Sequence, residues 1–111
     1  MKNALFKIPK KKLAQFCQRW KVSELALFGS ALREDFDSHS DVDILITFDE
    51  NADWGLWEHI QMRQELETLW RRPVDLVSKR ALMRSDNWLL RQEILSNVST
   101  IYKSLEDSYA P

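Results

Sequence analysis

The chain predicts a small α/β domain in which helices pack against a mixed β-sheet. Three short apolar runs, at 24–28, 42–48 and 74–77, have the continuous character of buried strands, and the second is rich in β-branched residues. The segments between and around them repeat apolar residues at helical spacing. Helices that alternate with short strands in this way are typical of a sheet covered by helices.

The first half of the chain predicts a helix at 10–20 and strands at 24–28 and 42–48. Pro9 suits the start of the first helix, because its fixed φ is already helical. Gly29 ends the first strand, and Ser30 is a suitable N-cap for a short helix that reaches about Asp35. The composition of 37–40 and of 49–53 is that of a loop and a polar turn. The apolar stripe of the first helix consists of Leu13, Phe16, Cys17 and Trp20.

The second half predicts a helix from about Leu56 to Arg72, a strand at 74–77 and a helix from about Asn87 to Ser96. Pro73 stops the first of these helices. Residues 98–102 are expected to add a short final strand. The buried side of the 56–72 helix is expected to carry Met62, Leu66, Leu69 and Trp70.

Length and composition bound the class of protein. The 111 residues suffice for one domain, so we expect 1–111 to fold as a single unit, with its catalytic core at about 22–82 and a C-terminal helix and tail at 86–111. Apolar residues make up 44% and charged residues 30%, as in ordinary globular proteins. The sequence contains no apolar run long enough for a membrane span or a secretory signal, so neither is expected. The single cysteine, Cys17, is expected in the core and suits a reducing cytoplasm.

Charge is distributed unevenly along the chain. Residues 34–53 contain eight Asp and Glu and no Lys or Arg, whereas residues 1–21 contain only basic charges. An acidic segment repels phosphate unless divalent cations lie between them, so nucleotide binding at this segment is expected to use metal. The basic N-terminal segment is interpreted as a solvated helix face, and no direct nucleic-acid binding is expected.

The most informative motif is Gly29-Ser30, followed after ten residues by Asp41-Val42-Asp43. Glycine lets the backbone approach a ligand closely, and Ser30 at a helix start presents free N–H groups to an anion. Residues two apart on a strand share one face, roughly 6.6 Å apart. Two carboxylates so placed can share a pair of Mg²⁺ ions roughly 3.5–4 Å apart. The motif therefore predicts a metal-dependent nucleotide site.

Two further residues are candidates for this site. Asp75 lies within an apolar strand, where a carboxylate is costly to bury without metal or hydrogen bonds. If its strand lies beside 42–48, Asp75 can hold the metal and accept a proton from an attacking hydroxyl. Arg33 is a candidate phosphate contact. The simpler interpretations are a strand-edge acid for Asp75 and a surface residue for Arg33, and His39 and His59 are interpreted as incidental.

The stretches 28–36 and 40–46, together with Arg72-Pro73-Val74-Asp75-Leu76-Val77, resemble the signature of the minimal nucleotidyltransferase (MNT) proteins. These belong to the DNA polymerase β-like nucleotidyltransferase superfamily, which implies a polymerase β-like core. The resemblance implies triphosphate binding by Gly29 and Ser30, and magnesium binding by Asp41 and Asp43. It also implies that Asp75 completes the catalytic triad. Many members have Arg-Gly after Gly-Ser, where this chain has Arg33-Glu34.

The resemblance and the short chain together predict an acceptor supplied by a partner protein. Stand-alone MNT proteins are antitoxins that transfer AMP from ATP to a tyrosine of a HEPN ribonuclease toxin, and this is the leading hypothesis. The alternatives are a non-catalytic module that occludes the toxin and a small-molecule nucleotidyltransferase of the aminoglycoside-resistance kind. Trp54 and Trp57, which flank Gly55, are candidate anchors for a partner.

Overall fold

The computed structural model describes residues 9–29 and 41–104. The predicted helix from Ser30 to Asp35, the loop at 37–40 and the last seven residues lie outside this part of the chain. Within it, the elements run in the following order: α1 (Lys10–Arg19), β1 (Val22–Phe28), β2 (Val42–Phe48), α2 (Leu56–Trp70), β3 (Val74–Ser78), α3 (Lys79–Arg84), α4 (Trp88–Ser96) and β4 (Val98–Lys103). None of the helices in these two stretches is both long and apolar enough to cross a membrane.

The four strands form one mixed sheet in the order β3-β2-β1-β4. β1 is antiparallel to both β2 and β4, whereas β2 and β3 are parallel. A parallel pair needs a crossover connection, and α2 provides it. The prediction of a mixed sheet packed by helices is therefore confirmed. β3, which carries Asp75, lies beside β2, and this is the condition under which Asp75 is expected to join the site.

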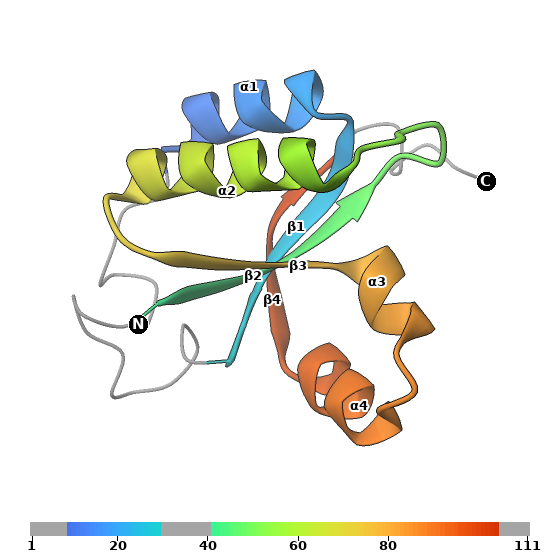
Figure 1. Ribbon diagram of the computed structural model, residues 1–111. Helices are drawn as coiled ribbons and strands as arrows, with labels where there is room; N and C mark the ends of the chain where they lie inside the picture. The colour runs from blue at the N-terminus through green and yellow to red at the C-terminus, as the bar shows by residue number, and fades with distance from the viewer. Residues whose placement is uncertain (1–8, 30–40, 105–111) are drawn as a thin grey trace.

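Helices cover both faces of the sheet, but they do so unequally. α1 and α2 lie side by side over one face, and the shorter α3 and α4 lie on the other side (Figure 1). The α1–α2 face encloses the main core, whose fully buried members include Leu13, Cys17, Ile44, Ile46, Met62 and Leu66. Burial raises the pKa of the Cys17 thiol to about 12, as expected for a core cysteine.

The α3–α4 face holds a smaller apolar cluster. Its buried members are Ala26, Phe28, Leu45, Leu82 and Ile94, with Val77 packed against them. α4 buries only Ile94 against the rest of the described chain. The main core therefore lies between the sheet and α1–α2, and the other face is left more open.

Several predicted bounds need correction. β1 begins at Val22 rather than at residue 24, and α2 ends at Trp70 because Arg71 adopts a left-handed conformation with φ 56°. Helix α3 was not predicted, since six residues are too few to show a period. Its start is capped by Ser78, whose hydroxyl accepts a hydrogen bond from the Ala81 N–H at 3.1 Å. The predicted helix at 87–96 and the final strand are confirmed as α4 and β4.

The two tryptophans beside Gly55 differ in exposure. Trp57 is 77% exposed, as an anchor for a partner requires. Trp54 is instead half-buried against Trp20, with ring centroids 5.2 Å apart in an edge-to-face arrangement. Its indole N–H donates to the Trp20 carbonyl at 2.7 Å. Trp54 therefore stabilises the link between α1 and α2 and is not available as a partner anchor.

Candidate catalytic site

The alternation of β2 places its acid and its core residues on opposite faces. Val42, Ile44 and Ile46 point into the main core beneath α1 and α2, and Leu45 packs in the smaller cluster on the other face. Asp43 therefore shares the face of Leu45, where it is partly buried. The same alternation in β3 buries Val74 and Leu76 in the main core and leaves Asp75 exposed on the opposite face.

Strand register aligns four residues in one row across the sheet. Val98 pairs with Phe28, Phe28 with Asp43, and Asp43 with Asp75. Directly paired residues point to the same face, and adjacent strands lie about 4.8 Å apart. The carboxylates of Asp43 and Asp75 are thus neighbours on the face that α1 and α2 do not cover. No spacing rule could predict this contact, because it depends on how two distant strands pair.

Gly29 lies directly after β1, against the Asp43 carboxylate. Its φ of +60° lies in the left-handed region that favours glycine. A Cβ atom at this position would lie 2.5 Å from Oδ2 of Asp43, far inside van der Waals contact. Any side chain at this position would therefore require the Asp43 carboxylate to move. The glycine predicted to approach a ligand is therefore adjacent to one of the predicted carboxylates.

The three predicted carboxylates act on one another electrostatically. Desolvation raises the pKa of Asp75 above its ordinary value, and the negative charges of Asp43 and then Asp41 raise it further. Asp41 is exposed and directly precedes β2, so it lies at the start of this strand rather than within it. Mutual repulsion among carboxylates is the environment that a bound divalent cation relieves.

A hollow of about 490 Å³ adjoins the carboxylates. Asp41 and Asp75 line it from the strands, and His59, Arg63 and Glu67 line it from α2. Arg63 is the one Lys or Arg among its lining residues and places a positive charge beside the acids. Sequence reasoning did not select Arg63, since nothing local in α2 indicates which strand its side chain will meet.

Two side chains of α2 hold β3 on either side of Asp75. The Glu67 carboxylate accepts a hydrogen bond from the Val74 N–H at 3.0 Å, and Nε2 of His59 lies 3.1 Å from the Leu76 carbonyl oxygen. These bonds satisfy backbone groups of an edge strand. The sequence alone marks His59 as incidental, but the structure shows that it helps to position the strand that carries Asp75.

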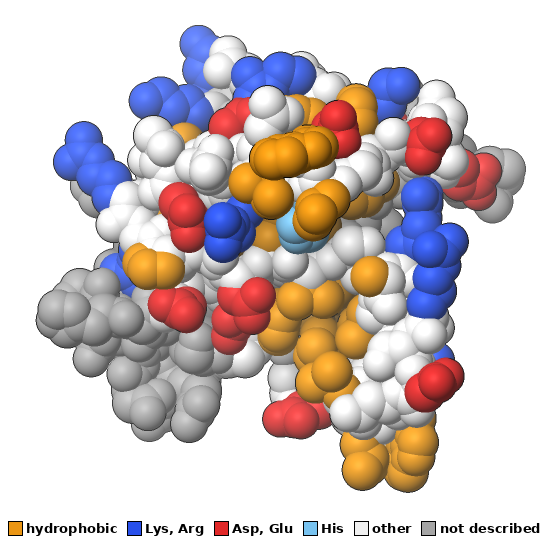
Figure 2. All heavy atoms as spheres, viewed as in Figure 1, with side chains coloured by type: hydrophobic (Ala, Val, Ile, Leu, Met, Phe, Trp, Pro, Cys, Tyr) orange, Lys and Arg blue, Asp and Glu red, His pale blue; other side chains and the backbone are white. Residues whose placement is uncertain are grey.

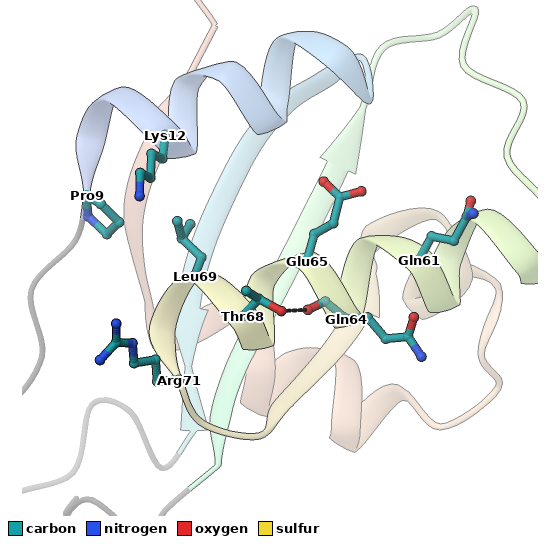
Figure 3. A pocket seen from close by; sticks show the side chains of 8 residues that line it. All are labelled: Pro9, Lys12, Gln61, Gln64, Glu65, Thr68, Leu69 and Arg71. Atoms are coloured by element: carbon teal, nitrogen blue, oxygen red, sulfur yellow. Dashed lines mark hydrogen bonds between the residues drawn. The ribbon is translucent and has the colours of Figure 1, made fainter.

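A larger hollow of about 730 Å³ lies on the other side of the molecule, between α1 and α2. Lys12 of α1 and Leu69 of α2 both extend into the space between the two helices (Figure 3). On its wall the Thr68 hydroxyl donates to the Gln64 carbonyl at 3.0 Å, and so is occupied within its own helix. The predicted carboxylates lie across the sheet from this hollow, so size alone does not locate the candidate site.

The donor set fits a hard divalent cation. Carboxylate oxygens are the ligands that Mg²⁺ prefers, and the protein commonly supplies one or two of them while nucleotide phosphates and water supply the rest. Across residues 9–29 and 41–104, no three His, Cys, Asp or Glu side chains converge tightly enough to hold a metal by themselves. Ser30 and Arg33, the other predicted ligand contacts, lie outside the described residues.

Comparison with known proteins relates this fold to one family. Residues 9–103 match the family model described as nucleotidyltransferase domain. A protein adenylyltransferase, MntA, of Thermococcus cleftensis is 40% identical over 65 residues, which cover 59% of this chain and 64% of that protein. A Methanocaldococcus jannaschii relative, provisionally named a protein adenylyltransferase, is 36% identical over 64 residues, which cover 58% of this chain and 64% of its own. Each match thus spans just under two thirds of the relative.

A solved structure shares the fold at lower identity. The tri-AMPylated HEPN toxin of Shewanella oneidensis in complex with an MNT antitoxin contains a chain that superimposes with a TM-score of 0.59. The match has 20% sequence identity and covers 97% of this chain and 77% of that one. At this identity the likeness concerns the arrangement of helices and strands.

Proposed function

The chain belongs to the nucleotidyltransferase domain family, and on that basis we propose that it transfers AMP from ATP to a tyrosine hydroxyl of a partner HEPN ribonuclease toxin and so neutralises it. The relatives named as protein adenylyltransferases and the AMPylated toxin in the similar complex support the choice of a protein acceptor.

The observation that carries the proposal is the pairing of Asp43 with Asp75, with Gly29 against the Asp43 carboxylate. A catalytic role requires carboxylates that are close, accessible and near a backbone that a phosphate can approach. These residues meet all three conditions on the open face of the sheet. Packing of the hydrophobic core does not explain why two acidic residues are paired at this position.

In the proposed reaction the acceptor oxygen attacks the α-phosphorus of ATP. A new O–P bond forms, the bond from the α-phosphorus to the bridging oxygen breaks, and pyrophosphate leaves with that electron pair. The hydroxyl proton passes to the Asp75 carboxylate and then to solvent. The raised pKa of Asp75 suits this role, because a carboxylate of higher pKa is a stronger base.

Asp41, Asp43 and Asp75 are the residues that would hold magnesium, two ions in the proposal. Bound there, the metal would neutralise triphosphate charge and favour ionisation of the attacking hydroxyl. Gly29 and Ser30 are proposed to cradle the triphosphate, with Arg33 as a further phosphate contact. The proposed reaction is placed in the cytoplasm, where ATP is available.

The two other functions remain separate alternatives. In one, the protein occludes its toxin without chemistry; in the other, it modifies a small molecule such as an aminoglycoside. The mutual repulsion at Asp75 argues against a simple occluding surface, because such a surface gains nothing from clustered acids. A small-molecule acceptor would be labelled with no partner protein present.

The test is labelling of the HEPN protein encoded beside this gene, with ATP labelled at the α-phosphate and with Mg²⁺. Asp43→Asn and Asp41→Asn are each expected to reduce labelling by at least about a thousandfold, because each removes charge from the metal site. Asp53→Asn, at an exposed position between β2 and α2, is the matched control and should label normally. If both site variants neutralise the toxin as well as the wild type does, catalysis is not the mechanism.

A further inference from the structure

The short helix α4 exposes more apolar side chain than it buries. Trp88 and Leu89 are 60% and 61% exposed, and Leu90, Leu95 and Val98 are also exposed, whereas only Ile94 is buried. Figure 2 shows hydrophobic side chains gathered over α3 and α4. We call the set Met83, Trp88, Leu89, Leu95 and Val98 the α4 surface.

The sequence of α4 is that of a helix covered on more than one side. Trp88 and Leu95 lie seven residues apart and share one side, whereas Leu89 lies about 100° away from Trp88. Polar residues (Arg91, Gln92, Glu93 and Ser96) lie between these sides, so α4 is apolar on more than one side without being apolar all round. Apolar side chains gathered on an exposed surface indicate a contact surface. The sheet covers only the side of Ile94, so the remaining apolar sides require a cover from outside the described part of the chain.

Register connects the α4 surface to the candidate carboxylates. Val98, which follows α4, lies in the same row as Phe28, Asp43 and Asp75 and on the same face. At about 4.8 Å per strand, Val98 is about 10 Å from Asp43 across the sheet. A protein that covers the α4 surface thus also reaches the carboxylates with a protruding side chain.

The basic residues near the α4 surface indicate which kind of partner surface would complement it. Residues 79–91 contain Lys79, Arg80, Arg84 and Arg91 and a single acid, Asp86. None of these four cations forms an ion pair with a carboxylate of the described residues. Arg91 donates a hydrogen bond to the Met83 carbonyl at 3.3 Å, and Arg80 donates one to the Ala52 carbonyl at 3.4 Å, toward the start of α2. Cations that lack a carboxylate partner beside an apolar centre are complementary to an apolar surface with acidic residues at its rim.

We propose that the α4 surface is the docking site of the protein that accepts AMP, which binds through an apolar patch bordered by carboxylates. This inference rests on the proposed function. Trp88 and Leu89 are the central anchors, and Arg84 lies at the rim. Docking here orders the acceptor beside Asp43 and Asp75, so that its hydroxyl is supplied on the open face of the sheet.

The test uses the purified HEPN protein encoded beside this gene and a double variant, Trp88→Ser with Leu89→Ser. Leu56→Ser with Trp57→Ser is the matched control, because it removes the same residue types from the first turn of α2, where they are 73% and 77% exposed. We expect the α4 variant to weaken binding by at least about 30-fold, the usual effect of losing a buried aromatic anchor. The control is expected to bind within threefold of wild type, a result that would also exclude Trp57, the anchor suggested by the sequence, as a contact of this partner.

Arg84→Glu provides a second, electrostatic measurement. It is expected to slow association about tenfold at low salt and less at high salt, as a rim charge does. In the transfer reaction, the α4 variant should raise KM for the acceptor and leave the rate at saturating acceptor unchanged, since it lies outside the carboxylate pair. Unchanged binding in the α4 variant, or an equal loss in the α2 control, overturns the proposal.

Three outcomes separate this proposal from the proposed function. Labelling that is lost in Asp43→Asn and normal in the α4 variant overturns the docking surface and leaves the transfer standing. Binding through the α4 surface with no AMP transferred overturns the proposed function and leaves the docking surface standing. A homodimer of the chain alone that the α4 variant dissociates assigns the surface to a second copy and overturns the docking proposal.

Discussion

The two faces of the sheet are supplied by the same strands and differ in almost every physical respect. On the α1–α2 face, side chains such as Ile44 and Met62 are fully buried in the main core. On the other face, the carboxylates of Asp43 and Asp75 lie side by side and Gly29 adopts a left-handed conformation. The apolar side chains of α4 on this side are largely exposed. Ile44 and Asp43 are adjacent in the chain and belong to opposite faces.

The difference separates stability from function. Burial of apolar area is the main source of folding free energy, so the α1–α2 face supplies most of it. The carboxylate face opposes folding through charge repulsion and is retained, in our account, because nucleotide chemistry requires it. Substitutions on the two faces should therefore affect different measurements, and the following predictions test that separation.

The largest effect on stability is expected for Ile44→Ala. Ile44 is completely buried, and truncating a side chain of this kind ordinarily costs about 2–5 kcal/mol of unfolding free energy. Denaturant unfolding measures the loss. Among the variant molecules that remain folded, the specific AMP-transfer rate should stay near that of wild type. If Ile44→Ala lowered the transfer rate without lowering the free energy of unfolding, Ile44 would belong to the catalytic machinery. The two faces would then not separate stability from function.

Gly29→Ala is expected to affect both measurements. A non-glycine residue at φ +60° costs about 1 kcal/mol, and the new methyl group also displaces the Asp43 carboxylate. We expect a stability loss of about 1–3 kcal/mol and a fall in transfer of at least about tenfold. Gly55→Ala is the matched control in the only other glycine, whose φ is −95°. Equal losses of stability and of transfer rate in the two variants would show that the contact between Gly29 and the Asp43 carboxylate has no effect of its own.

The smallest effect is expected in the dependence of stability on pH. The pKa of Asp75 is higher in the folded protein than its ordinary value of 3.8, so folding favours the protonated form. Its contribution to stability is therefore present at low pH and is lost as pH rises from that value through the folded pKa. Urea unfolding without metal should show this decline in wild type and less of it in Asp75→Asn. Identical slopes would mean that the carboxylates do not repel one another.

The local features of the molecule were predictable from its sequence. Continuous apolar runs located the strands, helical spacing located α1, α2 and α4, and the Gly29 and Asp41-x-Asp43 spacing selected the candidate site. The six-residue α3 was missed because it is too short to show a helical period. The end of α2 was predicted from Pro73, whereas the left-handed conformation of Arg71 ends the helix earlier.

The non-local features could not be predicted in the same way. The pairing of Asp43 with Asp75 depends on the parallel register of β2 and β3, which no residue spacing encodes. The contact of His59 with Leu76 and the approach of Arg63 to the carboxylates depend on how α2 crosses the sheet. The position of Val98 in the row of Asp43 required β4 to pair with β1.

The central claim is that the open face of the sheet transfers AMP. Its most direct test is the intact mass of the HEPN protein after incubation with ATP, Mg²⁺ and either wild type or Asp43→Asn. The account predicts mass increases in whole AMP units with wild type and none with Asp43→Asn, although the variant remains folded. AMP addition by Asp43→Asn at a rate near that of wild type would contradict it.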